Sequence, residues 1–177
     1  NYAASKKKLF FDYAPKKSVI NIDNNLGGNI YSELKASNSD TFSVSESKDA
    51  DILYTSFRDD LKKIVLKVSS PFGNEEIKLN THSKYLAVNA LCSIISLALE
   101  GFELQELAYS SSAIKFSRGR MSPIELDANN LCFIDYAHTP EALEFALKDL
   151  RSLGEATLWC LFGCGGERDK SKRMEMG

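Results

Sequence analysis

Several features that would assign this chain to a special class of protein are missing from its sequence. The four cysteines, Cys92, Cys132, Cys160 and Cys164, form no C-x-x-C pair, and the two histidines lie far from them in sequence. A zinc site is therefore weakly supported, and reduced cysteines in a cytosolic protein are the simpler interpretation. The net charge of −2 gives no overall basic field to recruit nucleic acid, so any anion site has to be a local cluster.

The sequence also lacks an apolar run long enough to span a membrane. Its most apolar stretch, residues 86–99, contains Asn89 and two serines, which is typical of a buried helix. With 44% hydrophobic and 26% charged residues, the composition is that of a soluble globular protein. The chain begins at Asn1 without an initiator Met or a signal-peptide pattern, and it opens directly on a helical pattern. We therefore expect an internal piece of a longer protein.

Residues 1–119 combine helix and strand patterns. Apolar residues at helical spacing predict a helix over 84–100, which Gly101 would end. We expect further helices from the start to about residue 12, over about 30–35 and, less regularly, over 103–114. Runs rich in β-branched and aromatic residues predict strands over 18–23, 41–45, 50–57, 62–70 and 75–80, with a hairpin turn at 71–74 and the cluster NNLGGN as another turn.

The last third of the chain has the pattern of a parallel-sheet domain. LCFIDYA (131–137) and ATLWCLF (156–162) are apolar runs suited to strands covered on both faces. Between them, Thr139 is a good N-cap for a helix that begins with Pro140. Strand, helix and strand make a βαβ unit, so we predict an α/β protein with two domains, residues 1–119 and 120–177.

A glycine-rich loop follows the last predicted strand, in FGCGGERDKSKR. Gly163, Gly165 and Gly166 would let backbone N–H groups approach an anion, and Arg168 and Lys172 are among the cations that follow. The loop matches neither a P-loop nor a dinucleotide-binding fingerprint. Taken alone, it fits a glycine-rich turn before a solvated charged helix about as well as it fits an anion site.

Other polar residues lie where binding residues are often found. Asp135 and His138 occupy the exit from a strand into a helix, where open α/β sheets bind ligands, although Asp135 there could simply cap the turn. Arg120 lies in SRGRM at the inferred domain junction, and a surface loop is the simpler explanation. Asn89 on its own is explained as a satisfied core group, and Lys6 as part of a solvated basic face.

The order and spacing of these stretches are more specific than any one of them. YAASKKKLF, VINID, VNALCSI, GRM, IDYAHTPEAL and LFGCGGERDKSKR follow one another in a way that resembles the Mur ligase family over essentially the whole chain. The last two stretches resemble the branch that adds the third residue of the peptidoglycan stem peptide. The resemblance implies the end of a P-loop-type central ATPase domain, followed by the start of a Rossmann-like C-terminal domain.

The resemblance also implies an activity. Family members use ATP and Mg²⁺ to activate a carboxylate of a UDP-linked peptide as an acyl phosphate, which the amine of an amino acid then attacks. Here the substrates would be a UDP-N-acetylmuramoyl-dipeptide and a free amino acid, either meso-diaminopimelate or L-lysine. We expect a monomeric bacterial protein of the cytoplasm that acts without nucleic acid or a membrane. Another Mur-type ligase, or a nucleotide-binding relative that has lost catalysis, remains an alternative.

Particular residues match the functional positions of the family. Lys6 matches the lysine that is carbamylated to hold Mg²⁺, and Arg168 matches the arginine that holds the carboxylate of the incoming amino acid. Lys172 would lie near the reacting phosphates. The nucleotide would be bound through four residues: Asn89 at the adenine, Arg120 reaching the nucleotide from the domain junction, Asp135 at the ribose and His138 lining the same cleft.

The chain departs from the family pattern at several positions. Ser83, Tyr85 and Leu86 replace the G, the F and the first N of the usual G-x-F-N-x-x-N motif, which puts adenine binding partly in doubt, whereas Asn89 retains its last asparagine. The paired acids after VIN are Asp-Asn, at 23 and 24, and Glu167 stands where Asp is commoner. We expect both of these changes to be tolerated. The P-loop would precede the chain and the segment that selects the amino acid would follow it.

Overall fold

The computed structural model describes residues 2–37, 39–47, 49–60, 63–127, 130–165 and 172–177. They divide into a first unit of residues 1–80 and 85–114 and a second unit of residues 81–84 and 115–177. The predicted domain boundary after residue 119 stays a prediction. Among the described residues, no helix combines the length and the apolar character needed to cross a membrane.

The first unit is built on a mixed sheet with the strand order β1-β2-β3-β4-β5. Its strands are β1 (Lys17–Asn21), β2 (Asp40–Ser45), β3 (Ile52–Asp60), β4 (Lys63–Ser70) and β5 (Gly73–Leu79). β1, β2 and β3 run parallel, and β3, β4 and β5 form an antiparallel meander. The strand predictions for this unit are therefore confirmed within a few residues. The parallel part brings the carboxyl ends of β1 and β2 to one edge of the sheet.

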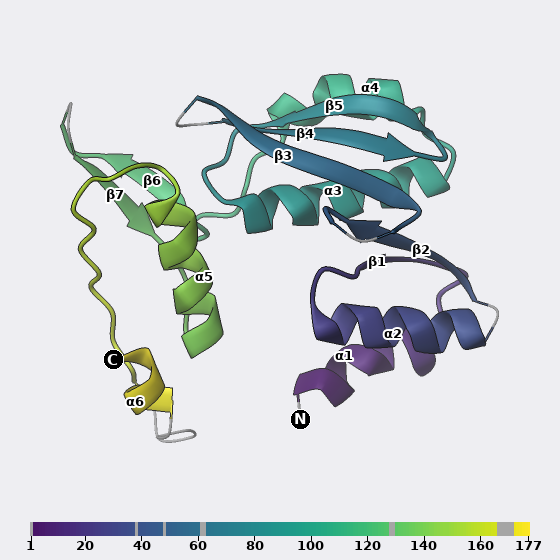
Figure 1. Ribbon diagram of the computed structural model, residues 1–177, viewed down its shortest axis with the longest axis horizontal. Coiled ribbons are helices and arrows are strands. Elements are labelled where there is room, and N and C mark those ends of the chain that lie inside the picture. The colour runs from purple at the N-terminus through teal and green to yellow at the C-terminus, as the bar shows by residue number, and fades with distance from the viewer. Residues whose placement is uncertain (1, 38, 48, 61–62, 128–129, 166–171) are drawn as a thin grey trace. The chain divides into compact units, whose positions relative to one another are not determined.

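Helices pack against this sheet (Figure 1). α1 (Tyr2–Phe11) lies beside α2 (Asn25–Ala36), α3 (Lys84–Leu99) runs along β3–β5, and α4 (Leu104–Ser110) with the 3-10 turn η1 (Ser111–Ala113) packs against β5. The apolar stripe predicted for α3 is buried, with Leu91 and Ile95 inaccessible to solvent. Elsewhere in the first unit, Ile20 of β1 and Ile22, which follows it, pack against Ile30 of α2.

α2 begins earlier than the predicted start at residue 30. Asn24 caps it, because its side-chain oxygen accepts a hydrogen bond from the Gly27 N–H at 2.9 Å. Gly27 lies against β1: a Cβ at this position would be 1.9 Å from the carbonyl oxygen of Asn21. The two glycines that suggested a turn therefore belong to the first turn of a helix that closely approaches the preceding strand.

The second unit contains β6 (Ser122–Glu125), β7 (Leu131–Ile134), α5 (Pro140–Arg151) and α6 (Lys172–Met176). The helix at 140–151 is confirmed, including its Thr139 cap and Pro140. β6 is antiparallel to β7 and was not predicted, because Pro123 interrupts a short sequence with little strand character. Near the start of α3, His82 packs edge-on against Phe133, with ring centroids 4.9 Å apart, and Ser83 Oγ donates to Asp149 Oδ2 at 2.8 Å.

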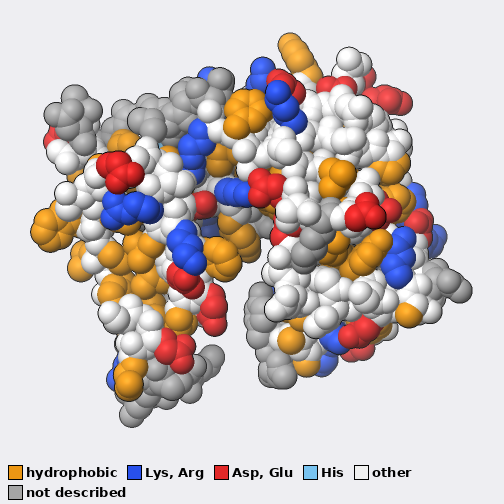
Figure 2. Space-filling view, in the orientation of Figure 1, with side chains coloured by type: hydrophobic (Ala, Val, Ile, Leu, Met, Phe, Trp, Pro, Cys, Tyr) orange, Lys and Arg blue, Asp and Glu red, His pale blue; other side chains and the backbone are white. Residues whose placement is uncertain are grey.

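Two predictions for the second unit are wrong. Residues 156–162 form no strand, and β7 is not buried on both faces. Trp159 and Leu161 are 89% and 101% exposed, and Figure 2 shows hydrophobic side chains exposed on this unit. Apolar strands need a parallel neighbour and helices on both faces, and the described residues of the second unit supply only β6 as a strand partner.

Candidate functional site

In the second unit, the turn between β7 and α5 carries polar and aromatic side chains close together in sequence: Asp135, Tyr136 and His138. Thr139 begins the helix: its Oγ1 accepts a hydrogen bond from the Ala142 N–H at 3.2 Å. Pro140 loses no hydrogen bond at the first helical position, and Glu141 lies near the positive end of the helix dipole. The local sequence therefore fixes the point where strand ends and helix begins.

Asp135 binds the turn that leads into β6. Its Oδ2 accepts a hydrogen bond from the Met121 N–H at 2.8 Å. The β6–β7 register explains this contact. Ser122 pairs with Ile134 in the antiparallel ladder, so Met121, which precedes β6, lies opposite Asp135, which follows β7. Met121 has a φ of +45°, a left-handed conformation that costs a non-glycine residue about 1–2 kcal/mol. The Asp135 carboxylate thus stabilises a strained turn.

The same turn positions Arg120. Gly119 has a φ of +75°, and its N–H donates to Ser122 Oγ at 2.9 Å. The Arg120 guanidinium carbon lies 5.2 Å from the centroid of the Tyr136 ring, which is cation–π geometry. A cation from the 118–122 turn is therefore held beside the β7–α5 turn.

His138 is oriented by the same tyrosine. Its Nδ1 lies 2.9 Å from the Tyr136 carbonyl oxygen, and the two rings are 5.1 Å apart. Because a carbonyl oxygen only accepts, Nδ1 carries the proton in this contact, and Nε2 of the neutral ring is an acceptor. Lys172 Nζ donates to the His138 carbonyl oxygen at 3.3 Å. The structure therefore brings together four of the predicted residues: Arg120, Asp135, His138 and Lys172.

The other predicted residues are described separately. Lys6 is exposed on α1, where its neighbour Lys7 forms an ion pair with Glu33. Asn89 is exposed on α3, so it is not the buried core group that was the simpler explanation. Arg168 lies outside the described residues. The sequence analysis missed Tyr136, which a closer look at DYAHTP could have found as an aromatic residue between two polar ligand candidates.

A second polar cluster surrounds Asp23, beyond the end of β1. Asp23 Oδ1 accepts hydrogen bonds from Ser45 Oγ at 2.5 Å and the Glu46 N–H at 3.2 Å, and Oδ2 accepts from the Tyr54 hydroxyl at 2.9 Å. Burial, together with the hydrogen bond to Asp23, raises the pKa of Tyr54 far above its ordinary value. Burial and the Asp23 charge raise the pKa of Cys92 to about 11. The thiol therefore stays protonated, and the cluster joins neighbouring strands instead of supplying a nucleophile.

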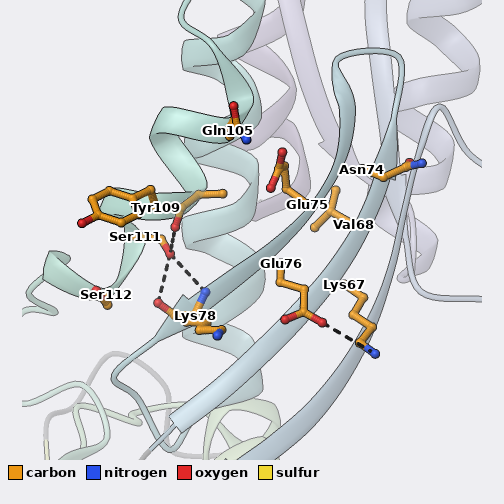
Figure 3. Close-up of a pocket in the computed structure, with 11 residues that line it drawn as sticks. Lys67, Val68, Asn74, Glu75, Glu76, Lys78, Gln105, Tyr109, Ser111 and Ser112 are labelled. Carbon is orange, nitrogen blue, oxygen red and sulfur yellow. Dashed lines mark hydrogen bonds and ion pairs between the residues drawn. The ribbon is translucent and has the colours of Figure 1, made fainter.

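A cavity of about 780 Å³ lies between β4–β5 and α4–η1 (Figure 3). Ser111 lines it, and its Oγ accepts a hydrogen bond from the Lys78 N–H at 3.0 Å. Lys67 and Glu76 form an ion pair at 3.6 Å on its strand side. None of the predicted site residues that the structure describes lines this cavity, so the cavity is separate from the β7–α5 turn.

Comparisons with known proteins agree with the resemblance seen in the motifs. The sequence model of the Mur ligase middle domain matches residues 1–97, and that of the Mur ligase glutamate ligase domain matches residues 119–177. The UDP-N-acetylmuramoyl-L-alanyl-D-glutamate--2,6-diaminopimelate ligases of Neisseria meningitidis serogroup B and Chromobacterium violaceum are each 35% identical over 180 residues. These alignments cover 99% of this chain and 37% and 36% of the relatives.

A solved structure of a ligase with the same name has a TM-score of 0.69 and 29% identity. The match covers 99% of this chain and 36% of that one. The chain thus spans a little over a third of the length of these relatives. The mixed α/β fold expected from the sequence is confirmed.

Proposed function

Because the chain belongs to the Mur ligase family, we propose that it acts in the ATP-dependent addition of 2,6-diaminopimelate to UDP-N-acetylmuramoyl-L-alanyl-D-glutamate. The observation that carries this proposal is the cluster of Arg120, Asp135, His138 and Lys172 around the β7–α5 turn. The names of the relatives favour diaminopimelate over L-lysine, between which the motifs did not decide.

The proposed reaction has two steps. The carboxylate of the dipeptide attacks the γ-phosphorus of ATP, which gives an acyl phosphate and ADP. The amine of the amino acid then attacks the acyl carbon, and the tetrahedral intermediate loses phosphate and a proton to form the amide. Two anions have to meet in the first step, and an oxyanion develops in the tetrahedral intermediate of the second. Cations such as Arg120 and Lys172 would lower both barriers by offsetting this charge.

Each residue of the site has a proposed role. Asp135 has a second oxygen, Oδ1, besides the one that binds Met121, and a carboxylate oxygen suits the hydroxyls of a ribose. The Arg120 guanidinium suits a phosphate, and the Nε2 acceptor of His138 suits a donor on the nucleotide. Asn89 would contact adenine through its amide. Arg168 would hold the carboxylate of the amino acid, and Lys172 would lie near the phosphates.

Within the described part of the chain, no group of three or more His, Cys, Asp or Glu residues could hold a metal ion. The described residues therefore do not form a magnesium site by themselves. Lys6 would contribute to such a site only after carbamylation, which replaces its cation with anionic oxygen ligands of the kind that Mg²⁺ prefers.

The wider assignments follow from the same proposal. The enzyme would be a monomer in the bacterial cytoplasm, working in peptidoglycan synthesis. Residues 1–119 would belong to its central ATP-binding domain and residues 120–177 to its amino-acid-binding domain.

The test is an assay of ADP release by the full-length protein with ATP, Mg²⁺ and the UDP-linked dipeptide. We expect release to depend on diaminopimelate, with L-lysine giving little product. Release with L-lysine alone would reverse the choice of amino acid. No amide product with either amino acid, despite nucleotide binding, would show a relative that has lost catalysis.

A further inference from the structure

Tyr136 is the residue of the β7–α5 turn to which neither the motif nor the comparisons give a role. Tyr136 is 64% exposed, so a contribution to the hydrophobic core does not explain it. Yet two other side chains contact its ring. The Arg120 guanidinium carbon lies 5.2 Å from the ring centroid, and the centroid of the His138 imidazole lies 5.1 Å from it. An exposed aromatic ring between two proposed nucleotide ligands suggests a role in their placement.

Arg120 needs such placement because its backbone alone does not fix the position of its guanidinium. The hydrogen bond from Met121 to Asp135 and the left-handed turn determine where the Arg120 backbone lies. The long side chain beyond it still has several rotatable bonds, and ordering it costs free energy. A guanidinium stacked on an aromatic face loses much of that freedom before any ligand arrives, and it keeps its N–H donors at its edge.

We propose that Tyr136 is a positioning residue that holds the Arg120 guanidinium ready for the phosphates of the nucleotide. This inference rests on the proposed function, in which Arg120 reaches the nucleotide. The ring acts through its π-face, so its hydroxyl is dispensable. Tyr136→Phe retains the platform, whereas Tyr136→Leu keeps apolar bulk but removes the aromatic face.

The experiment measures kcat and the KM for ATP in the full-length ligase. We expect Tyr136→Leu to lower kcat about three- to fivefold, since an exposed cation–π contact is worth about that factor, and Tyr136→Phe to stay within about twofold of wild type. Tyr109, 89% exposed on α4 in the first unit, supplies the matched control, and Tyr109→Leu should leave kcat unchanged. Thermal unfolding of each variant shows whether folding is affected.

Double variants show whether Tyr136 acts through Arg120 or through His138. In an Arg120→Ala background, Tyr136→Leu should cause no further loss, whereas in a His138→Ala background the loss should persist. An undiminished loss without Arg120, or a loss that disappears only without His138, would overturn the inference. So would wild-type kcat in Tyr136→Leu. If the wild-type protein neither binds ATP nor releases ADP, the proposed function fails first; an active enzyme impaired by Arg120→Ala but not by Tyr136→Leu refutes the inference alone.

Discussion

Asp23 shows how one carboxylate can join several strands. It follows β1, and its hydrogen bonds reach Ser45 at the end of β2 and Tyr54 in β3. Tyr54 is almost fully buried, so its hydroxyl needs a partner, and the carboxylate supplies a charged acceptor. The departure from the family's paired acids leaves this residue in place. The first acid is therefore sufficient for the strand connection.

Cys92 makes this cluster sensitive to high pH. Its pKa is raised from 9.0 to about 11, mainly by burial and then by Asp23. Between these values the unfolded chain loses a proton that the folded chain keeps, so stability is fully present below pH 9 and falls as pH rises toward 11. We expect the melting temperature of the wild-type protein to fall more steeply over this range than that of Cys92→Ala. Parallel melting curves for the two proteins would contradict this explanation.

Single residues were predictable from the sequence where a motif carried them. Asp135 and His138 belong to a recognisable stretch, and the structure adds partners that no motif contains. The link from Asp135 to Met121 depends on the register of β6 with β7, and β6 itself was not predicted. Tyr136 was missed for the same reason, because it follows β7 whereas its partner Arg120 precedes β6.

At the scale of elements, α2 shows that the spacing between a helix and a strand can determine which residue type fits at a position. Gly27 and Gly28 are adjacent in its first turn, but only Gly27 faces β1 closely. A Cβ on Gly27 would be 1.9 Å from the Asn21 carbonyl oxygen, whereas one on Gly28 would lie 4.0 Å from the nearest backbone oxygen, that of Ile22. Two glycines of the same helix therefore have opposite expected responses to the same substitution.

We predict that Gly27→Ala destabilises the protein by about 1–3 kcal/mol, because helix and strand have to move apart. Gly28→Ala should stabilise it by up to about 1 kcal/mol, because alanine loses less backbone freedom in a helix. Thermal unfolding of the two variants beside wild type measures both effects. Equal shifts in the same direction would show that the close approach to β1 does not limit this position.

The strands also show where composition predicts structure and where it does not. In the first unit, β3, β4 and β5 are neighbours in sequence, and each finds an antiparallel partner locally. β1 and β2 pair in parallel across α2 and were predicted from their own β-branched residues. The run 156–162 is equally apolar, yet it forms no strand in the structure. Its pattern predicts a buried parallel strand, which depends on partners distant in sequence rather than on its own residues.

At the scale of the whole molecule, the predicted ligands of the nucleotide are divided between the two units. Asn89 belongs to the first unit, and Arg120, Asp135 and His138 belong to the second. The family resemblance assigned all four from motif order alone. Strand register and helix capping place the three in the second unit on adjoining turns, and their role as ligands stays a prediction. What the order of motifs predicted and the comparisons confirm is the family, which no single spacing indicated.

The proposed role of Lys6 would connect the first unit to the chemistry of the site. Its neutral amine would attack carbon dioxide and lose a proton, which leaves a carbamate with two anionic oxygen ligands. We predict that Lys6→Ala lowers the rate of ligation by the full-length enzyme about a hundredfold or more, because charge stabilisation at the reacting phosphate is lost. Lys8, exposed on the same helix, supplies the matched control, and Lys8→Ala should stay within about twofold of wild type.

A second measurement separates the carbamate from a simple loss of positive charge. Lys6→Arg keeps a cation at this position but cannot form the same carbamate, so it should be as inactive as Lys6→Ala. In ¹³C-bicarbonate, the wild-type protein should show a carbamate carbon signal that both variants lack. Full activity in Lys6→Arg, or a carbamate signal that survives the replacement of Lys6, would exclude Lys6 as the modified residue. A wild-type protein that ligates without any such signal would show that the reaction does not need the modification.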